Sequence, residues 1–165
     1  MPPRPNSGIS VRKARPGDID AVDMIEQRSF TADRFARPAL KRLLASPSAH
    51  ALIAEIAGAA AGYAIVLLRS GSSVARLYSI AVDPAARGQG VASALLLAAE
   101  RAACARGRRL LRLEVRASNR SALSLYRRAG FTLFERKRSY YPDGEDALRL
   151  EKRLEPRKSG GRSAH

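Results

Sequence analysis

The sequence predicts an α/β protein of the α+β type. About four helices flank one central sheet, which is mostly antiparallel and contains one splayed pair of parallel strands. Residues 75–115 read as strand, loop, Ala/Leu-rich helix and strand, and a crossover of this kind joins parallel strands. Residues 51–68 read as two apolar runs around a glycine-containing loop, which is typical of an antiparallel hairpin. A chain of 165 residues is long enough for one domain with its own core.

The elements before residue 75 follow from turn residues and apolar spacing. Asp18 ends a Pro-Gly-Asp turn, and we expect it to cap the first helix. Gly58 and Gly62 are expected in the hairpin loop. The expected elements are a strand, two helices and the two hairpin strands, at residues 9–13, 19–30, 38–45, 51–56 and 63–68.

The later elements are bounded by caps and glycines. Gly107 stands at the expected C-terminus of the long helix, between two arginines that suit the negative end of the helix dipole. Asn119 is expected to cap the next helix, and Gly130 to end it. The expected elements are a helix, a strand, a helix and two strands, at residues 91–106, 110–115, 120–129, 131–134 and 147–154. We expect a disordered leader, one folded domain and a disordered basic tail, at residues 1–8, 9–154 and 155–165.

The loop in residues 87–92, Arg-Gly-Gln-Gly-Val-Ala, suits a phosphate. The first N–H groups of a helix lack backbone partners, and the positive end of the helix dipole lies behind them. Arg87 adds a charge, while Gly88 and Gly90 remove side chains that would keep a pyrophosphate from the backbone. Ser93 breaks the dinucleotide fingerprint, and a Walker loop needs a Gly-Lys-Ser/Thr triplet that the chain lacks. A plain strand–helix connection is the alternative interpretation.

Composition narrows the class of protein. The net charge of +15 favours anionic ligands and disfavours polycationic ones, and we expect any binding of nucleic acid to be incidental. No apolar run is long enough to span a bilayer and no hydrophobic signal segment opens the sequence, so we expect a cytoplasmic protein without membrane contact. Cys104 is the only cysteine, which excludes an internal disulfide and a cysteine cluster, and no metal is expected.

Four motifs in one order resemble the GNAT N-acetyltransferases, and among them the ribosomal-protein-alanine N-acetyltransferases of the RimI type. The first is the Arg-x-x-Gly-x-Ala loop after an Ile-Ala-Val-Asp-Pro strand end. The others are Leu-Glu-Val-Arg-Ala-Ser-Asn-Arg-Ser-Ala, Leu-Tyr followed by Ala-Gly-Phe, and Tyr-Tyr-Pro-Asp-Gly-Glu-Asp-Ala, within residues 113–122, 125–131 and 140–147. The last string also resembles the amino-terminal acetyltransferases of archaea and eukaryotes. The resemblance covers residues 9–154 and is strongest over 77–147.

The resemblance implies the GNAT fold, acetyl-CoA as the acetyl donor and a polypeptide amino group as the acceptor. It implies that Glu114 is the general base and Tyr126 the general acid. It also implies that Tyr140 and Tyr141 line the acceptor groove. The implied acetyl-CoA site combines a strand end, the loop and one asparagine, namely Ile80, Ala81, Val82, Arg87, Gly88, Gln89, Gly90, Val91, Ala92, Ser93 and Asn119.

Acetyl transfer requires these residue types independently of the family. An amine attacks only when neutral, so a carboxylate must take its proton, directly or through water. A phenol with a pKa of about 10 can protonate a thiolate whose conjugate acid lies near 8.5 only while the bond to sulfur breaks. Glu114 shares the strand parity of Arg112 and Arg116, so a solvated strand face is the alternative for it, and ordinary packing is the alternative for the tyrosines.

The expected acceptor is the α-amino group of a polypeptide, with a ribosomal protein as a plausible target. An α-amine has a pKa of about 7.7–8.0 against about 10.4 for lysine, so it is neutral far more often at pH 7. RimI-type enzymes typically carry an aromatic Pro-Trp segment after the first helix, whereas this chain has residues 29–35 there and no Trp. The alternatives are an enzyme acting on lysine side chains or small amines, and a ribosome- or RNA-associated module without turnover. The presence of Glu114, Tyr126 and Asn119 argues against such a module.

Overall fold

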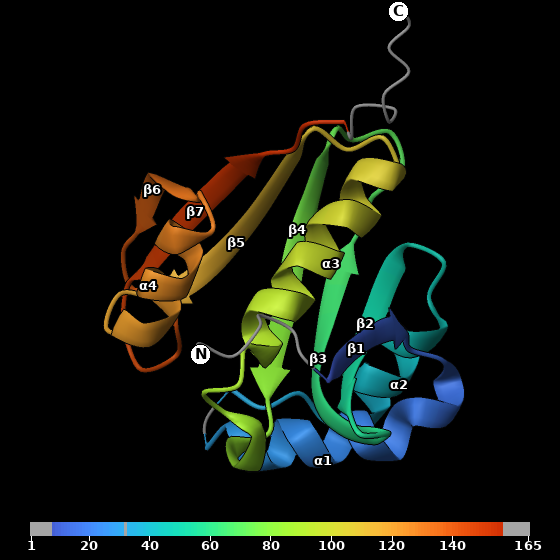
Figure 1. The fold of residues 1–165 in the computed structure, drawn as a ribbon. Helices are drawn as coiled ribbons and strands as arrows, with labels where there is room; N and C mark the ends of the chain where they lie inside the picture. Colours follow the sequence, from blue (N-terminus) through green and yellow to red (C-terminus); the bar gives the residue numbers. More distant parts are fainter. Residues whose placement is uncertain (1–7, 32, 157–165) are drawn as a thin grey trace, which may run out of the picture.

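The computed structural model describes residues 8–31 and 33–156, which form a seven-stranded sheet with four α-helices on its two faces (Figure 1). The strand order is β1-β2-β3-β4-β5-β7-β6, and every neighbouring pair is antiparallel except β4 and β5. The expected fold class is therefore confirmed. The elements are β1 (Ile9–Lys13), α1 (Ile19–Ser29), α2 (Arg37–Ala45), β2 (Ala49–Ile56), β3 (Ala59–Leu67), β4 (Val74–Val82), α3 (Val91–Ala105), β5 (Leu110–Arg116), α4 (Arg120–Arg128), β6 (Thr132–Lys137) and β7 (Ala147–Arg153), with short 3₁₀ turns η1 (Pro16–Asp18) and η2 (Pro84–Ala86).

The parallel pair is short and opens along its length. β4 and β5 pair only from Val74 to Arg76 and from Leu110 to Arg112, although both strands continue beyond these residues. Figure 1 shows the two strands diverging from this contact. The second half of β4 therefore pairs with β3 on one side and, within the part of the chain that the structure describes, has no strand partner on the other side.

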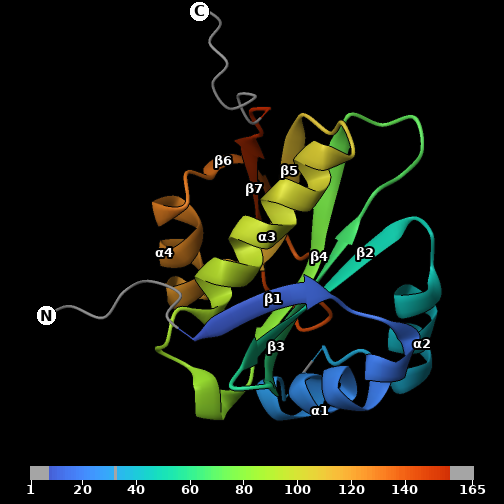
Figure 2. The same ribbon diagram turned by 45° about the vertical axis from the view of Figure 1, so that its right-hand side comes forward.

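The helices divide between the two faces of the sheet. Leu95 and Leu96 of α3 and Leu123 of α4 share one core cluster with Leu111 and Leu113 of β5. The apolar side chains of α1 and α2 belong to a second cluster, with the opposite faces of β2, β3 and β4. In both ribbon views α1 and α2 lie beside each other, whereas α4 lies next to β6 and β7 (Figures 1 and 2). The face of β5, β7 and β6 that points away from α3 thus carries no helix among the described residues.

Gly62 lies inside β3, so its expected place in the hairpin loop is wrong. The turn consists of Ala57 and Gly58, which have φ values of 53° and 81°, as a two-residue hairpin turn of the primed type requires. A Cβ atom on Gly62 would lie 2.8 Å from the carbonyl oxygen of Ala81 and 2.9 Å from Cγ1 of Val91. Glycine is needed there because α3 crosses close over β3 and β4.

Asp18 also acts differently from the expected helix cap. It stands at the N-cap position of α1, but its side chain accepts no hydrogen bond from that helix. Its carboxylate instead accepts hydrogen bonds from the backbone N–H of Arg15, at 2.7 Å, and from both terminal nitrogens of Arg12, at 2.9 Å. These contacts lower the pKa of Asp18 to about 2, with the Arg12 hydrogen bonds as the first cause. Asp18 therefore ties η1 to β1.

The expected leader and tail lie largely outside the described residues. Only Gly8 of the leader and Glu155 and Pro156 of the tail are described, so these segment boundaries stay predictions. Within the ranges that the structure describes, the search for a helix long and apolar enough to cross a membrane finds none.

Candidate active site

The loop before α3 presents backbone N–H groups to solvent. Gly88 and Gly90 adopt the left-handed conformation, with φ values of 79° and 87°. A Cβ atom on Gly88 would meet no atom within 4 Å, so the backbone conformation, and not crowding, is what favours glycine there. Among the described residues the N–H groups of residues 88–90 donate no backbone hydrogen bond, and the first bond into α3 runs from Ala94 N to Gly90 O at 3.1 Å. The loop and the first turn of α3 are therefore open to an anion.

Both ends of this loop are fixed. Asp83 caps η2 by accepting a hydrogen bond from Ala85 N at 2.9 Å, and it pairs with Arg28 of α1 at 3.3 Å. Gly90 begins α3 as its N-cap residue. Between them, Arg87 is exposed at the start of the glycine turn. The expected phosphate residues thus lie together on an anchored turn.

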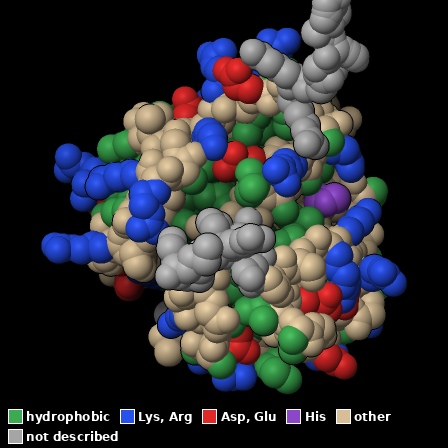
Figure 3. All heavy atoms as spheres, viewed as in Figure 1, with side chains coloured by type: hydrophobic (Ala, Val, Ile, Leu, Met, Phe, Trp, Pro, Cys, Tyr) green, Lys and Arg blue, Asp and Glu red, His purple; other side chains and the backbone are tan. Residues whose placement is uncertain are grey.

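A groove of about 280 Å³ between α3 and α4 starts beside this loop. It is lined by Ser93, Leu96, Leu97, Glu100, Leu125, Arg128, Ala129 and Lys152. Asn119 begins α4, and its Oδ1 accepts a hydrogen bond from Ala122 N at 3.1 Å, so the expected cap is confirmed. Arg120, Arg127 and Arg128 of α4 are exposed. Figure 3 shows Lys and Arg side chains along this edge of the molecule, which favours an anionic ligand.

Glu114 lies on the other face of the sheet. Leu113 and Val115 point into the core beneath α3, and side chains alternate along a strand, so Glu114 points away from α3. Its side chain is only 8% exposed. Oε1 pairs with Arg76 of β4, and Oε2 accepts a hydrogen bond from Nε of Arg149 at 3.2 Å. The carboxylate therefore sits at the gap between β4 and β5 with both oxygens occupied.

Tyr126 belongs to the core beneath α3 and α4. It is 5% exposed, and its ring packs edge-on against Phe131 with 5.7 Å between centroids. Burial raises the pKa of Tyr126 to about 12, with a smaller contribution from Tyr141. The phenol therefore keeps its proton at physiological pH and can donate a hydrogen bond.

Tyr140 and Tyr141 form an edge-on pair with ring centroids 5.0 Å apart. Tyr140 is 41% exposed and its hydroxyl accepts a hydrogen bond from Arg76 at 3.4 Å. The pKa of Tyr141 is raised to about 12, first by burial and then by Tyr140, with a smaller contribution from Glu114. The two tyrosines expected in the acceptor groove thus lie on the same face as the candidate base.

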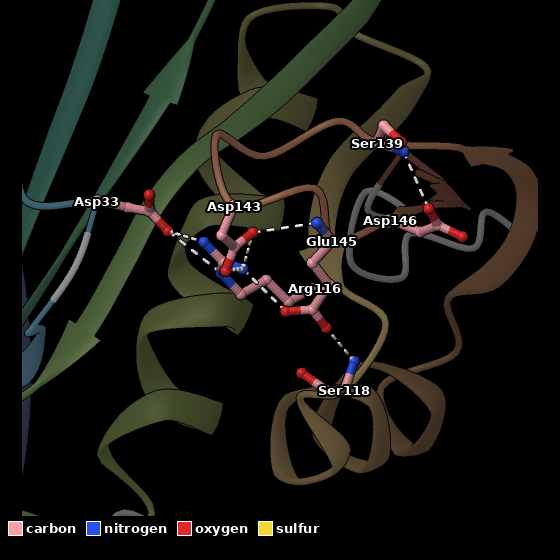
Figure 4. Close-up of polar contacts among 7 residues, drawn as sticks. All are labelled: Asp33, Arg116, Ser118, Ser139, Asp143, Glu145 and Asp146. Carbon is pink, nitrogen blue, oxygen red and sulfur yellow. Dashed lines mark hydrogen bonds and ion pairs between the residues drawn. The ribbon is translucent and has the colours of Figure 1, made fainter.

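Arg116 joins two loops at this face (Figure 4). Its guanidinium pairs with Asp33 of the α1–α2 loop and, from the β6–β7 loop, with Asp143 at 2.9 Å and Glu145 at 2.8 Å. It also lies 4.2 Å from the ring centroid of Tyr141. The pKa of Glu145 is lowered, first by Ser118 and next by Arg116. One side chain therefore holds both loops beside Glu114.

The α1–α2 loop is anchored to α1 by a buried carboxylate. Glu26 is fully buried, and its Oε2 accepts a hydrogen bond from Phe35 N at 2.9 Å. The hydroxyl of Tyr63 donates to Oε1 of Glu26, and it also contacts the hydroxyl of Ser79 at 2.9 Å. The ring of Phe35 stacks on Tyr78, with 5.1 Å between centroids. Residues 29–35, which replace the Pro-Trp segment of RimI-type enzymes, therefore contribute one ring of an aromatic pair, Phe35 on Tyr78.

Sequence reasoning missed the residues that border the acceptor face. Arg76, Arg116, Asp33 and Phe35 come from three separate segments, and none of them was assigned a role from the sequence. Asp33 and Phe35 lie within residues 29–35, the segment that was compared with the Pro-Trp segment. One signal was available for Arg116, because it shares its strand parity with Glu114. The described part of the chain holds no group of three or more His, Cys, Asp or Glu side chains that could bind a metal ion.

The family model described as acetyltransferase (GNAT) family matches residues 19–131 of this chain. A relative from Bacillus subtilis, named putative [ribosomal protein bS18]-alanine N-acetyltransferase, is 37% identical over 140 residues, which are 84% of this chain and 91% of that protein. A second relative, N-alpha-acetyltransferase RimI from Mycobacterium tuberculosis, is 37% identical over 81% of this chain and 85% of its own.

Two solved acetyltransferase structures have a fold similar to that of this chain. The crystal structure of the ribosomal-protein-S18-alanine N-acetyltransferase from Escherichia coli superimposes with a TM-score of 0.81 at 30% identity, covering 93% of this chain and 98% of that one. Nourseothricin acetyltransferase superimposes with a TM-score of 0.75 at 27% identity, over 90% of this chain and 100% of that one. The first of these enzymes is named for a ribosomal protein and the second for nourseothricin, so the shared fold does not decide the acceptor.

Proposed function

The chain belongs to the acetyltransferase (GNAT) family and is an acetyl-CoA-dependent N-acetyltransferase, and we propose that its acceptor is the α-amino group of a polypeptide, with a ribosomal protein as the first candidate. The observation that carries this proposal is the placement of Glu114, a nearly buried carboxylate beside two tyrosines on the helix-free face of the sheet. The names of the relatives support the choice of acceptor.

In this proposal the donor and the acceptor approach from opposite faces. The free N–H groups of the loop and the charge of Arg87 suit the pyrophosphate of CoA, and the groove between α3 and α4 starts beside them. Ile80, Ala81 and Val82 form the unpaired edge of β4, which can hydrogen-bond an extended pantetheine arm. The splay between β4 and β5 would then let the acetyl group reach Glu114.

Glu114 takes the amine proton in the proposed reaction. The acceptor reaches the site mostly as an ammonium, and it becomes a nucleophile only after it loses a proton to the carboxylate or to a water held by it. The nitrogen then attacks the thioester carbonyl carbon, and the bond from carbon to sulfur breaks to release the CoA thiolate. The nitrogen loses its second proton to water, and the acetyl group stays on it as a neutral amide. Arg149 keeps the carboxylate oriented through this step.

Tyr126 stabilises the leaving sulfur. With its pKa raised to about 12, the phenol is a weaker acid than a thiol of about 8.5, so a complete proton transfer before departure is unfavourable. A hydrogen bond from the phenol to sulfur strengthens as negative charge builds there. We therefore assign Tyr126 to hydrogen-bond donation during bond cleavage: the phenol keeps its proton, and CoA leaves as the thiolate.

Mass spectrometry of acetylated peptides tests the acceptor. One peptide has the sequence of the host's own bS18 amino terminus and one internal lysine, and its matched partner has the same sequence with a blocked amino terminus. We expect acetyl transfer to the α-amine of the first peptide and none to the second. Modification confined to lysine in both peptides would instead assign the enzyme to side-chain amines.

A further inference from the structure

The two arginines on Glu114 are held very differently. Arg149 lies opposite Glu114 in the register between β5 and β7, and it has a second carboxylate partner, Glu135, at 2.7 Å. Its guanidinium also lies 4.9 Å from the ring centroid of Phe134, and its side chain is 23% exposed. Contacts on several sides therefore fix Arg149.

Arg76 has weaker support. Glu114 is its only carboxylate partner among the described residues, and its side chain is 42% exposed. Its other hydrogen bond, to the hydroxyl of Tyr140, is long at 3.4 Å, and its guanidinium lies 5.4 Å from the centroid of Tyr78. Its Nε atom is buried without a hydrogen-bond partner in the described part of the chain. Of the two cations on Glu114, Arg76 is the one that can leave.

The position of Arg76 is the one that an acceptor needs. A positively charged amine must come within hydrogen-bond distance of a Glu114 oxygen, or of a water on it, before it can lose a proton. Oε2 is held by the fixed Arg149, so Oε1 is the available oxygen, and Arg76 occupies it. The guanidinium and the incoming ammonium carry the same charge and compete for the same acceptor atom.

We propose that Arg76 is a resident cation that occupies Glu114 in the free enzyme and is displaced by the acceptor's ammonium group. Arg76 is then a positioning residue, since it acts on the reaction only through Glu114. This inference rests on the proposed function, because it requires an amine acceptor that uses Glu114. Its consequence is that the wild-type enzyme binds its acceptor less tightly than it would without Arg76.

Steady-state kinetics of Arg76→Gln tests the competition. We expect the KM for an acceptor peptide to fall roughly threefold to fivefold, as removal of a half-exposed ionic competitor implies, with the larger change in KM and not in kcat. Arg76→Lys keeps a cation at the position and should retain most of the wild-type KM. If Arg76→Gln unfolds at a lower temperature than the wild type, Arg76→Met replaces it, and we expect the same fall in KM.

Arg112→Gln is the matched control. Arg112 is the register partner of Arg76 on β5 and points to the same face, but it pairs with Glu151 at 2.8 Å and not with Glu114. Its removal takes one positive charge from the same surface, so an effect of the general field would appear in both variants. We expect the KM of Arg112→Gln to stay within about twofold of the wild-type value.

A peptide lacking the α-amine separates charge competition from steric opening. Its inhibition constant against the amine peptide should be the same for wild type and Arg76→Gln, because it brings no ammonium to Glu114. An unchanged or raised KM in Arg76→Gln, or an equal gain for the desamino peptide, overturns the inference. Failure of the wild-type enzyme to acetylate any peptide amino terminus would overturn the proposed function instead.

Discussion

The two faces of this protein form their sites by different means. The face under α3 offers mainly backbone atoms, the free N–H groups of one loop and the unpaired edge of β4, all within residues 77–93. The opposite face offers charged and aromatic side chains from distant segments, around Asp33, Arg76, Glu114, Arg116 and Tyr141. A site made from backbone needs a local conformation, whereas one made from side chains needs the whole fold.

This difference separates what enzymes of one family share from what distinguishes them. A cofactor bound by backbone groups places few demands on side chains other than glycine, so many sequences can keep such a site. An acceptor bound by side chains changes with every substitution on the loops that carry them. The following four predictions test whether the two faces act independently, in order of decreasing expected effect.

Loss of the carboxylate should stop chemistry without disturbing the cofactor face. We expect Glu114→Gln to lower kcat by about 10²-fold or more, because the amide cannot accept the amine proton, and to leave the CoA dissociation constant within about twofold. Steady-state kinetics and calorimetry with CoA measure the two effects. Glu151→Gln is the control, since it removes the same charge from the neighbouring β7, where Glu151 pairs with no described residue other than Arg112. A Glu114→Gln enzyme that kept a tenth of its turnover would require another base.

A methyl group on Gly62 should disturb the cofactor face through packing alone. The added Cβ would lie 2.8 Å from Ala81 O, 2.9 Å from Val91 Cγ1 and 3.0 Å from Leu95 Cδ1. We expect Gly62→Ala to lower the free energy of unfolding by about 1–3 kcal/mol, measured by denaturant titration. Gly17→Ala is its control, because no atom lies within 4 Å of the new Cβ there. Equal stability of the two variants would mean that α3 and the sheet can separate freely.

A carboxylate in the loop should weaken the binding of CoA more than backbone strain alone does. Gly90 has a φ of 87°, so both Gly90→Ala and Gly90→Asp are strained, and aspartate tolerates this conformation better than alanine. We nevertheless expect Gly90→Asp to bind CoA about tenfold more weakly than Gly90→Ala, because its charge faces the phosphates. Calorimetry on the pair measures the difference. Equal affinities would remove the loop from the phosphate site.

Removal of the Arg116 guanidinium, which joins the α1–α2 loop to the β6–β7 loop, should weaken the binding of the acceptor and not that of CoA. We expect Arg116→Gln to raise the acceptor KM about fivefold and to leave CoA affinity unchanged, since three carboxylates and Tyr141 lose their common partner. Arg136→Gln is the control, because Arg136 is exposed on β6 and its one ion pair among the described residues is with Asp146, at 2.8 Å. A matching loss of CoA affinity in Arg116→Gln would show that the two faces are coupled.

The fold and the conformation of the loop before α3 could be predicted from the sequence because both depend on local features. Strand parity, helix caps and the glycines at 88, 90, 107 and 130 mark the element boundaries, and all four glycines have positive φ values. Asp18 and Gly62 were assigned wrongly because tertiary contacts decide their roles. Arg12 draws the carboxylate of Asp18 away from α1, and the approach of α3 determines that position 62 is glycine.

The acceptor face was only partly predictable. Glu114, Tyr140 and Tyr141 were identified through a family resemblance, and the structure brings them to one face of the sheet. Arg76 was not identified, because a strand arginine looks the same in sequence whether it faces solvent or a buried carboxylate. Its contact with Glu114 depends on the short parallel register of β4 and β5, which no local pattern specifies.

That short register also has a consequence for motion. Only three residue pairs join β4 to β5, so the sheet consists of two parts, β1–β4 and β5–β7, that are hydrogen-bonded to each other at one end. In the free protein, amide hydrogens along the open margin of β4 should exchange with deuterium much faster than those facing β3, because no neighbouring strand shields them. A bound cofactor that hydrogen-bonds to this margin would reversibly link the two parts of the sheet. Amide protection would then rise along residues 77–82, while the remote edge at β1 and β2 would keep its original exchange rates.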